Sequence, residues 1–232
     1  MEDSNTISSS SLLPVGEVGR GFEIILASKS PRRQQLLSDL GLKFSVQSMD
    51  IPEEFPAQLG MTEVSVYLAE LKAEAFRPQL KDNQLVITAD TIVWLDGQVL
   101  NKPTDYADGF RMLKDLSGKK HQVITGVCLL SSDKKVSFYA LTDVWFKELS
   151  DEEIHYYLEH YQPYDKAGAY GIQEWIGYIG IYRIEGSFFN VMGLPVQSVY
   201  EHLKTFWKSE RKIDSLQCFK TDHCLRNNLK DK

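Results

Sequence analysis

Residues 28–33 combine side chains that can bind phosphate. The run Ser-Lys-Ser-Pro-Arg-Arg directly follows Glu23–Ala27, a short apolar stretch typical of a buried strand. Free backbone N–H groups at the start of a helix, hydroxyls and guanidinium groups can together bind an anion. Ser30 and Pro31 are equally typical of a helix N-cap and first turn. The local sequence therefore fits both a phosphate site and a simple cap.

Carboxylates suited to a hard cation lie in two later segments. Asp90 interrupts the apolar segment Leu85–Leu95, and we expect it at a strand end that faces a cleft, although a structural aspartate would look the same. Mg²⁺ usually binds through one or two carboxylates plus substrate phosphates, so a second acid is needed. Glu53 is the best candidate, with Asp50 and Glu54 as rivals in a loop that could equally be a solvated acidic turn.

Three lysines could neutralise phosphate charge. Lys72 lies at the edge of the apolar face of a helix expected over residues 63–76, so its stem can cross the core towards a cleft. Lys102 follows a predicted hairpin, and Lys166 lies in a loop near Gly168. Each of them could instead extend into solvent, which is the commoner situation for a lysine.

Several common catalytic motifs are missing from the sequence. It contains no Gly-x-x-x-x-Gly-Lys-Ser/Thr loop, no Gly-x-Gly-x-x-Gly fingerprint, no Gly-x-Ser-x-Gly elbow and no histidine pair at metal-ligand spacing. The cysteines, Cys128, Cys218 and Cys224, show no disulfide or metal spacing and indicate reduced, intracellular thiols. Ordinary P-loop, dinucleotide-binding and serine-hydrolase functions lose their main support.

The elements expected around these residues mix strands and helices. Strands are expected over residues 23–27, 43–47, 85–95, 98–100, 121–130, 136–146, 176–184 and 188–192, and helices over about 31–40, 63–76, 105–116, 150–162 and 195–206. The order predicts an α/β fold with parallel units early and hairpins in the middle. We expect one central mixed β-sheet flanked by helices, in two lobes with an active-site cleft between them.

Composition and the chain ends limit the class of protein. With 232 residues, 43% of them hydrophobic, the chain can bury one large domain, expected over residues 22–207 between a disordered lead (1–21) and a polar tail (208–232). A net charge of -6 argues against a nucleic-acid partner. The sequence shows neither a signal peptide nor an apolar stretch of membrane-spanning length, so a cytoplasmic protein without membrane contact is expected.

A series of short motifs runs in order along the expected domain. They are Ser28-x-Ser-Pro-Arg-Arg33-x-x-Leu-Leu37, Tyr67-Leu-Ala-x-x-Lys72-Ala73, Ala89-Asp-Thr-x-Val93, Leu100-x-Lys-Pro103, Leu116-Ser-Gly118, Thr125-Gly126, Asp165-Lys-Ala-Gly168 and Gly193-Leu-Pro195. Together they resemble the Maf family of nucleotide pyrophosphatases. Chance agreement over so many ordered blocks is improbable, so signals that are weak one by one support each other.

This resemblance implies a Maf/ITPase-like fold and the hydrolysis of a nucleoside triphosphate to its monophosphate and pyrophosphate. The catalytic residues would be Asp90 as acid/base, Glu53, Lys72 and Lys102, with Glu53 and Asp90 holding a divalent cation, Mg²⁺ or Mn²⁺. Residues that would bind the substrate and its phosphates are Ser28, Arg32, Arg33, Thr91, Lys166 and Gln173. A homodimer is also suggested by the resemblance.

The segment 167–173 resembles the branch of the family that acts on dTTP and UTP, with modified pyrimidine nucleotides as further expected substrates. Gln173 would contribute to base specificity, because an amide offers both a donor and an acceptor. The following residues Glu174, Trp175 and Ile176 depart from the Gly-rich continuation common in relatives. A 7-methyl-GTP pyrophosphatase and a non-catalytic nucleotide-binding regulator of cell division are the alternatives.

Overall fold

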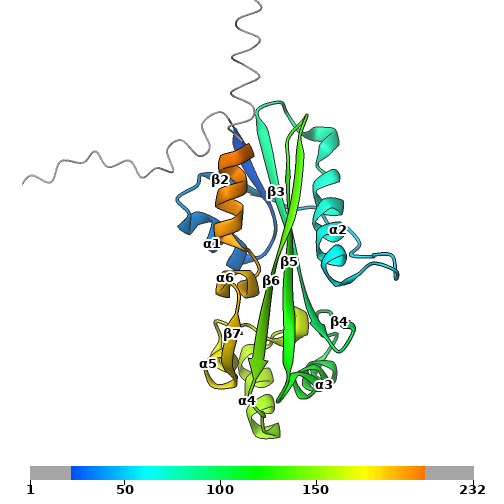
Figure 1. The fold of residues 1–232 in the computed structure, drawn as a ribbon, viewed down its shortest axis with the longest axis vertical. Helices are drawn as coiled ribbons and strands as arrows, with labels where there is room; N and C mark the ends of the chain where they lie inside the picture. Colours follow the sequence, from blue (N-terminus) through cyan, green and yellow to red (C-terminus); the bar gives the residue numbers. More distant parts are fainter. Residues whose placement is uncertain (1–21, 207–232) are drawn as a thin grey trace, which may run out of the picture.

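The computed structural model describes residues 22–206 (Figure 1). The lead and tail expected over residues 1–21 and 208–232 lie outside the described residues. Strands are β1 (Glu23–Ala27), β2 (Phe44–Gln47), β3 (Gln84–Leu95), β4 (Gln98–Leu100), β5 (Lys120–Leu130), β6 (Lys135–Phe146) and β7 (Ile181–Glu185). Helices are α1 (Pro31–Asp39), α2 (Met61–Glu74), α3 (Tyr106–Leu116), α4 (Asp151–Tyr161), α5 (Trp175–Gly180), α6 (Phe188–Met192) and a helix over residues 196–206. Within the described range, no helix has the length and apolarity to cross a membrane.

The strands form one mixed seven-stranded sheet in the order β2-β1-β3-β5-β6-β7, with β4 pairing β3. β1 is parallel to β2 and β3, whereas every later pairing is antiparallel. The β3–β4 hairpin turns at Asp96 and Gly97, whose φ angles of 50° and 86° fit the left-handed positions of a tight hairpin turn. The predicted mixed α/β sheet, parallel first and then hairpin-connected, is confirmed.

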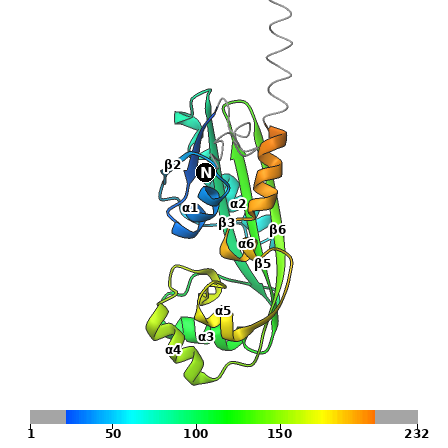
Figure 2. The ribbon, with the colours of Figure 1, turned by 90° about the vertical axis from the view of Figure 1, so that its left-hand side faces the viewer.

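Two lobes share the long strands β3, β5 and β6 (Figures 1 and 2). In the upper lobe α2 packs on one side of the sheet, and α1 with the helix over residues 196–206 covers the other. In the lower lobe α3, α4 and α5 pack around a second core that includes Val93, Phe146 and Tyr157. Each lobe buries its own apolar cluster, so a cleft can lie between them.

The predicted strand over residues 188–192 is wrong, and the one over residues 176–184 is correct only from Ile181 onwards. Residues 176–184 form the helix α5 followed by the strand β7, and residues 188–192 form the helix α6. In α5, a Cβ on Gly177 would lie 1.9 Å from the carbonyl oxygen of Ile172, so the first turn packs on the preceding loop as only glycine allows. In α6, Ser187 caps the helix by accepting the backbone N–H of Asn190. A tertiary contact thus favours a helix at the start of the first segment, and a helix cap favours a helix in the second.

The expected break in the strand at Asp90 is also absent. β3 runs unbroken, and Asp90 pairs with Gly126 of β5 in the middle of the ladder. The opening arises on the other edge of β3, where β1 pairs only as far as Ile87 and β4 begins to pair at Val93. Residues 88–92 therefore have an open edge, and the chain of β1 turns away there into α1.

Candidate active site

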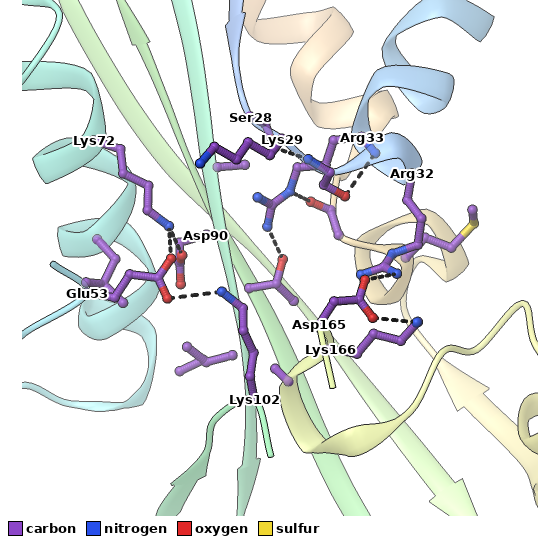
Figure 3. A pocket seen from close by; sticks show the side chains of 18 of the residues that line it. Ser28, Lys29, Arg32, Arg33, Glu53, Lys72, Asp90, Lys102, Asp165 and Lys166 are labelled. Carbon is purple, nitrogen blue, oxygen red and sulfur yellow. Dashed lines mark hydrogen bonds and ion pairs between the residues drawn. The ribbon is translucent and has the colours of Figure 1, made fainter. Parts of the chain in front are cut away.

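A cleft of about 770 Å³ lies along this open edge, between the two lobes. Every predicted site residue lines it: Ser28, Arg32, Arg33, Glu53, Lys72, Asp90, Thr91, Lys102, Lys166 and Gln173. Of the two rivals to Glu53, Asp50 also lines the cleft but forms an ion pair with Lys29 at 2.6 Å. The fold thus brings together residues from α1, α2, β3 and four loops. Figure 3 shows the labelled side chains among them, such as Arg33, Glu53 and Lys72, converging on the cleft.

One wall of the cleft carries a cluster of carboxylates and lysines. The ammonium of Lys72, from α2, donates hydrogen bonds to Asp90 of β3 and, at 2.7 Å, to Oε1 of Glu53 (Figure 3). Lys102 donates to Oε2 of Glu53 at 3.3 Å. Even residues of β3 face α2, as the hydrogen bond from Thr88 to the carbonyl of Ala69 shows, so the strand period itself directs Asp90 towards Lys72.

The two carboxylates of this cluster have opposite environments. Burial raises the pKa of Asp90, although the positive charges of Lys72 and Arg33 act against the rise. Burial also tends to raise the pKa of Glu53, but hydrogen bonds and attraction from Lys72 and Lys102 outweigh it and leave this pKa lowered. Paired groups whose environments separate their pKa values are suited to different chemical roles. Burial thus makes Asp90 more basic than an exposed aspartate, whereas the lysines make Glu53 less basic than an exposed glutamate.

The donor set fits a divalent cation that is completed by substrate. Because one ammonium contacts both Glu53 and Asp90, a small cation could reach both carboxylates at once. Among the described residues, no three His, Cys, Asp or Glu side chains are grouped so as to hold a metal ion. Two carboxylates plus phosphate and water oxygens match the way Mg²⁺ binds in nucleotide enzymes.

The turn before α1 serves as a helix cap and also borders the cleft. Ser30 Oγ accepts the backbone N–H of Arg33 at 3.5 Å, and Pro31 is the first helical residue, so the predicted cap is confirmed. Ser28, only 7% exposed, accepts the backbone N–H of Ser30 through its Oγ at 3.2 Å. The two interpretations of this turn are compatible, because capping uses Ser30 while Ser28, Arg32 and Arg33 also line the cleft.

Arg33 is held by oxygen acceptors from two other elements. Its Nε donates to the carbonyl of Gly193 at 2.7 Å, and its NH2 group donates to Oγ1 of Thr91 at 2.9 Å. Thr91 in turn lies 2.9 Å from the hydroxyl of Thr125, which donates to the carbonyl of Asn190. Burial lowers the pKa of Arg33, with the charge of Asp90 acting against this. Arg33 is thus fixed in direction, with one guanidinium edge available to the cleft.

The opposite wall comes from the loop after α4. Asp165 accepts hydrogen bonds from Arg32 at 3.1 Å and from Lys166 at 2.6 Å, which joins the two lobes across the cleft (Figure 3). Gln173 contributes a buried Oε1 without a hydrogen-bond partner among the described residues. Asp165 and Thr125 are not among the predicted site residues, because an isolated loop acid or strand threonine has no spacing pattern. Their occurrence in the recognised motifs is the only signal that could have found them.

Comparison with known proteins identifies the family. Residues 23–206 match the family model described as Maf-like protein. The dTTP/UTP pyrophosphatases of Bacteroides thetaiotaomicron and Phocaeicola vulgatus are 54% and 56% identical, each over 79% of this chain and 95% of the relative. Among solved structures, the Staphylococcus aureus Ham1 protein matches at 19% identity with a TM-score of 0.39, covering 56% of this chain and 72% of that chain. The protein whose cleft is described above belongs to the Maf family.

Proposed function

We propose that this protein hydrolyses dTTP and UTP to the nucleoside monophosphate and pyrophosphate, with a divalent cation as cofactor. The observation that carries the proposal is the cluster of Glu53, Lys72, Asp90 and Lys102, which faces Arg32 and Arg33 across one cleft. The names of the relatives, dTTP/UTP pyrophosphatases at 54% and 56% identity, support the choice of pyrimidine triphosphates.

The chain's own groups account for the chemical step. A water attacks the α-phosphorus, the bond from that phosphorus to the leaving pyrophosphate oxygen breaks, and Asp90 takes the proton of the water. The buried position of Asp90, which raises its pKa, makes it a stronger base than an exposed aspartate. Lys72 and Lys102 neutralise charge that develops on the leaving pyrophosphate, while Arg32 and Arg33 hold the phosphates in position. No covalent intermediate is needed.

Glu53 and Asp90 are the residues that would hold Mg²⁺ or Mn²⁺. The bound cation would lower the pKa of the attacking water and screen the phosphate charge. The ammonium of Lys72 contacts both carboxylates, so it would have to shift for a cation to bind both of them. Phosphate oxygens would then replace carboxylates as its hydrogen-bond acceptors.

An assay on the purified full chain tests the function. The protein is supplied with Mg²⁺ or Mn²⁺ and with UTP, dTTP, 7-methyl-GTP or ATP, and pyrophosphate release is followed. We expect turnover of UTP and dTTP to exceed that of the two purine nucleotides. Faster turnover of 7-methyl-GTP than of UTP and dTTP would show that the enzyme is a 7-methyl-GTP pyrophosphatase. Tight nucleotide binding without pyrophosphate release would favour the alternative of a non-catalytic regulator.

Replacement of Asp90 tests the assigned proton acceptor. Asp90→Asn keeps the size of the side chain but removes its basicity, so we expect kcat to fall about a hundredfold or more. Circular dichroism and the unfolding midpoint check that the fold is kept. Turnover close to the wild-type value in a folded variant would show that another group takes the proton.

A further inference from the structure

The carboxylate of Glu174 joins the loop wall of the cleft to the core of the lower lobe. Oε2 of Glu174 accepts a hydrogen bond from the hydroxyl of Tyr157 in α4, and Oε1 lies 3.1 Å from the ammonium of Lys166. The Tyr157 hydroxyl also accepts the backbone N–H of Gly171 at 3.0 Å. Lys166 and Gly171 both line the cleft. Glu174 therefore links α4 to Lys166, and Tyr157 links α4 to Gly171 of the same loop.

This contact is sheltered, unlike most ion pairs of the structure. The side chains of Lys166 and Glu174 are 9% and 19% exposed, whereas Asp165, the other carboxylate on Lys166, is 60% exposed. A buried ammonium needs a counter-ion with good geometry, and loss of a sheltered partner is costly. Glu174 is thus the more sheltered of the two carboxylates that bind Lys166, and Asp165 links the same lysine to Arg32 across the cleft.

The carboxylate of Glu174 also packs against the backbone of this loop. Gly168 and Ala169 adopt left-handed φ angles of 68° and 59°, a conformation that an alanine keeps only when its surroundings enforce it. A Cβ on Gly171 would lie 2.7 Å from the carboxylate carbon of Glu174, so the side chain packs directly onto this glycine. The backbone N–H of Glu174 also donates to the carbonyl of Gly171 at 3.0 Å.

We propose that Glu174 is a positioning residue for the nucleotide site, holding Lys166 and the backbone of residues 171–173 in place to receive the substrate. The inference rests on the proposed function and adds a residue that the sequence analysis did not place in the site. Glu174 does not itself line the cleft, so it acts through Lys166 and the loop. The cluster around Asp90 lies on the other wall. A change at Glu174 should accordingly weaken nucleotide binding and leave the chemical step nearly intact.

Glu174→Gln is the first test. An amide has one carbonyl oxygen and one NH₂ group, so it cannot accept from both Tyr157 and Lys166 on separate oxygens. We expect the KM for UTP to rise about tenfold, the scale of one lost charge-assisted hydrogen bond, with kcat within about threefold of the wild type. The dissociation constant of UTP in Mg²⁺ buffer, measured by calorimetry, should rise by the same factor.

Glu153→Gln is the matched control. Glu153 in α4 forms an ion pair with Lys147 at 2.7 Å, and neither residue lines the cleft. A glutamine at this position can still complete the capping box of α4. The control loses the same charge beside a lysine, so any general effect of a lost ion pair appears in it too. We expect its KM and kcat to match the wild type.

A double-mutant cycle separates positioning from simple support of the fold. If Glu174 acts through Lys166, then Glu174→Gln should add little to the KM increase that Lys166→Ala already causes. The inference would be overturned if the KM increases of the two single variants were fully additive in the double variant, or if Glu174→Gln left KM unchanged. It would also be overturned if Glu174→Gln lowered kcat as much as it raised KM and lowered thermal stability in parallel. If Glu174→Gln fails to fold, Tyr157→Phe tests the same link, with a smaller KM increase expected. Wild-type protein that binds UTP without releasing pyrophosphate would defeat the proposed function alone, because the calorimetric comparison would still decide the role of Glu174.

Discussion

Asp90 and Thr91 are neighbours in β3 that project to opposite sides of the strand. Asp90 contacts Lys72 on the side of α2, and Thr91 contacts Arg33 on the side of α1. Because this part of β3 has a free edge, side chains from both sides of the sheet reach one cleft. Two adjacent residues thereby place the Asp90 carboxylate and the Arg33 guanidinium at the same cleft.

Thr91→Val tests whether the orientation of Arg33 matters. Valine has nearly the same shape, but it removes the oxygen that accepts from Arg33 and contacts Thr125. We expect the KM for UTP to rise about tenfold, the effect of roughly 1.5 kcal/mol, which is the lower end for one hydrogen bond to a charged group, with a smaller change in kcat.

Thr88→Val, on the same strand, is the control for that measurement. It also removes one buried hydrogen bond, from Thr88 to the carbonyl of Ala69 at 2.6 Å, but Thr88 does not line the cleft. We expect lower stability and an unchanged KM. An equal KM increase in both variants would mean that strand packing, rather than the guanidinium, determines substrate binding.

At the scale of elements, α2 and β5 approach each other closely in the upper lobe. A Cβ added to Gly126 would lie 2.3 Å from the backbone of Ser65. Gly126 is also the ladder partner of Asp90, and Ser65 precedes Lys72 by two helical turns on the same face of α2. The glycine therefore lets α2 lie close enough to the sheet for Lys72 to reach Asp90.

Gly126→Ala should both destabilise the fold and impair the site. The added methyl must push α2 away from β5, and overpacking of this kind typically costs about 1–3 kcal/mol. We expect a loss at the upper end of that range in urea unfolding, together with lower kcat because Lys72 shifts from Asp90. Gly60→Ala is the contrast: its nearest atom is Oε2 of the flexible Glu63 side chain at 3.2 Å, so about 1 kcal/mol or less is expected. Equal losses in the two variants would contradict the close-packing argument.

Sequence patterns predicted those elements that follow a single local rule. β1, the capped start of α1 at Ser30 and the capping box of α4 at Ser150 and Glu153 appear where they were expected. Segments of five or six apolar residues have too few positions for their period to separate a strand from a helix, so α5 and α6 were assigned wrongly.

The site residues followed from motif order, whereas the open edge beside Asp90 follows from where β1 and β4 stop pairing. Such a tertiary arrangement leaves no trace in local sequence.

At the scale of the whole molecule, the lower lobe is tied to the sheet by a buried polar contact. His121 of β5 is 2% exposed, and its Nε2 lies 2.7 Å from the hydroxyl of Tyr170, a residue of the cleft loop. Its ring also meets Phe146 and Tyr170 edge to face. Its Nδ1 is buried without a hydrogen-bond partner among the described residues, so the cavity offers no acceptor for a second ring proton.

This histidine should make the stability of the fold depend on pH. Burial lowers the pKa of His121 from 6.5 to about 3, and the charge of Asp143 offsets this only in part. Tyr170, the facing titratable group, has a pKa raised by burial and stays protonated. Below pH 6.5 His121 binds a proton in the unfolded chain but not in the folded chain. The free energy of unfolding therefore falls as the pH falls from 6.5 towards 3.

The slope for one such group is about 1.4 kcal/mol per pH unit, which predicts a loss of about 2 kcal/mol between pH 7 and pH 5. His121→Phe keeps a ring in the cavity and removes the titrating group. Urea unfolding at pH 7 and pH 5 measures the free energy of unfolding of both proteins. The carboxylates common to both contribute equally, and the hydrogen bond lost with the histidine lowers stability at both pH values. We expect the drop from pH 7 to pH 5 to be about 2 kcal/mol smaller in the variant, and equal drops would show that His121 is not protonated upon unfolding.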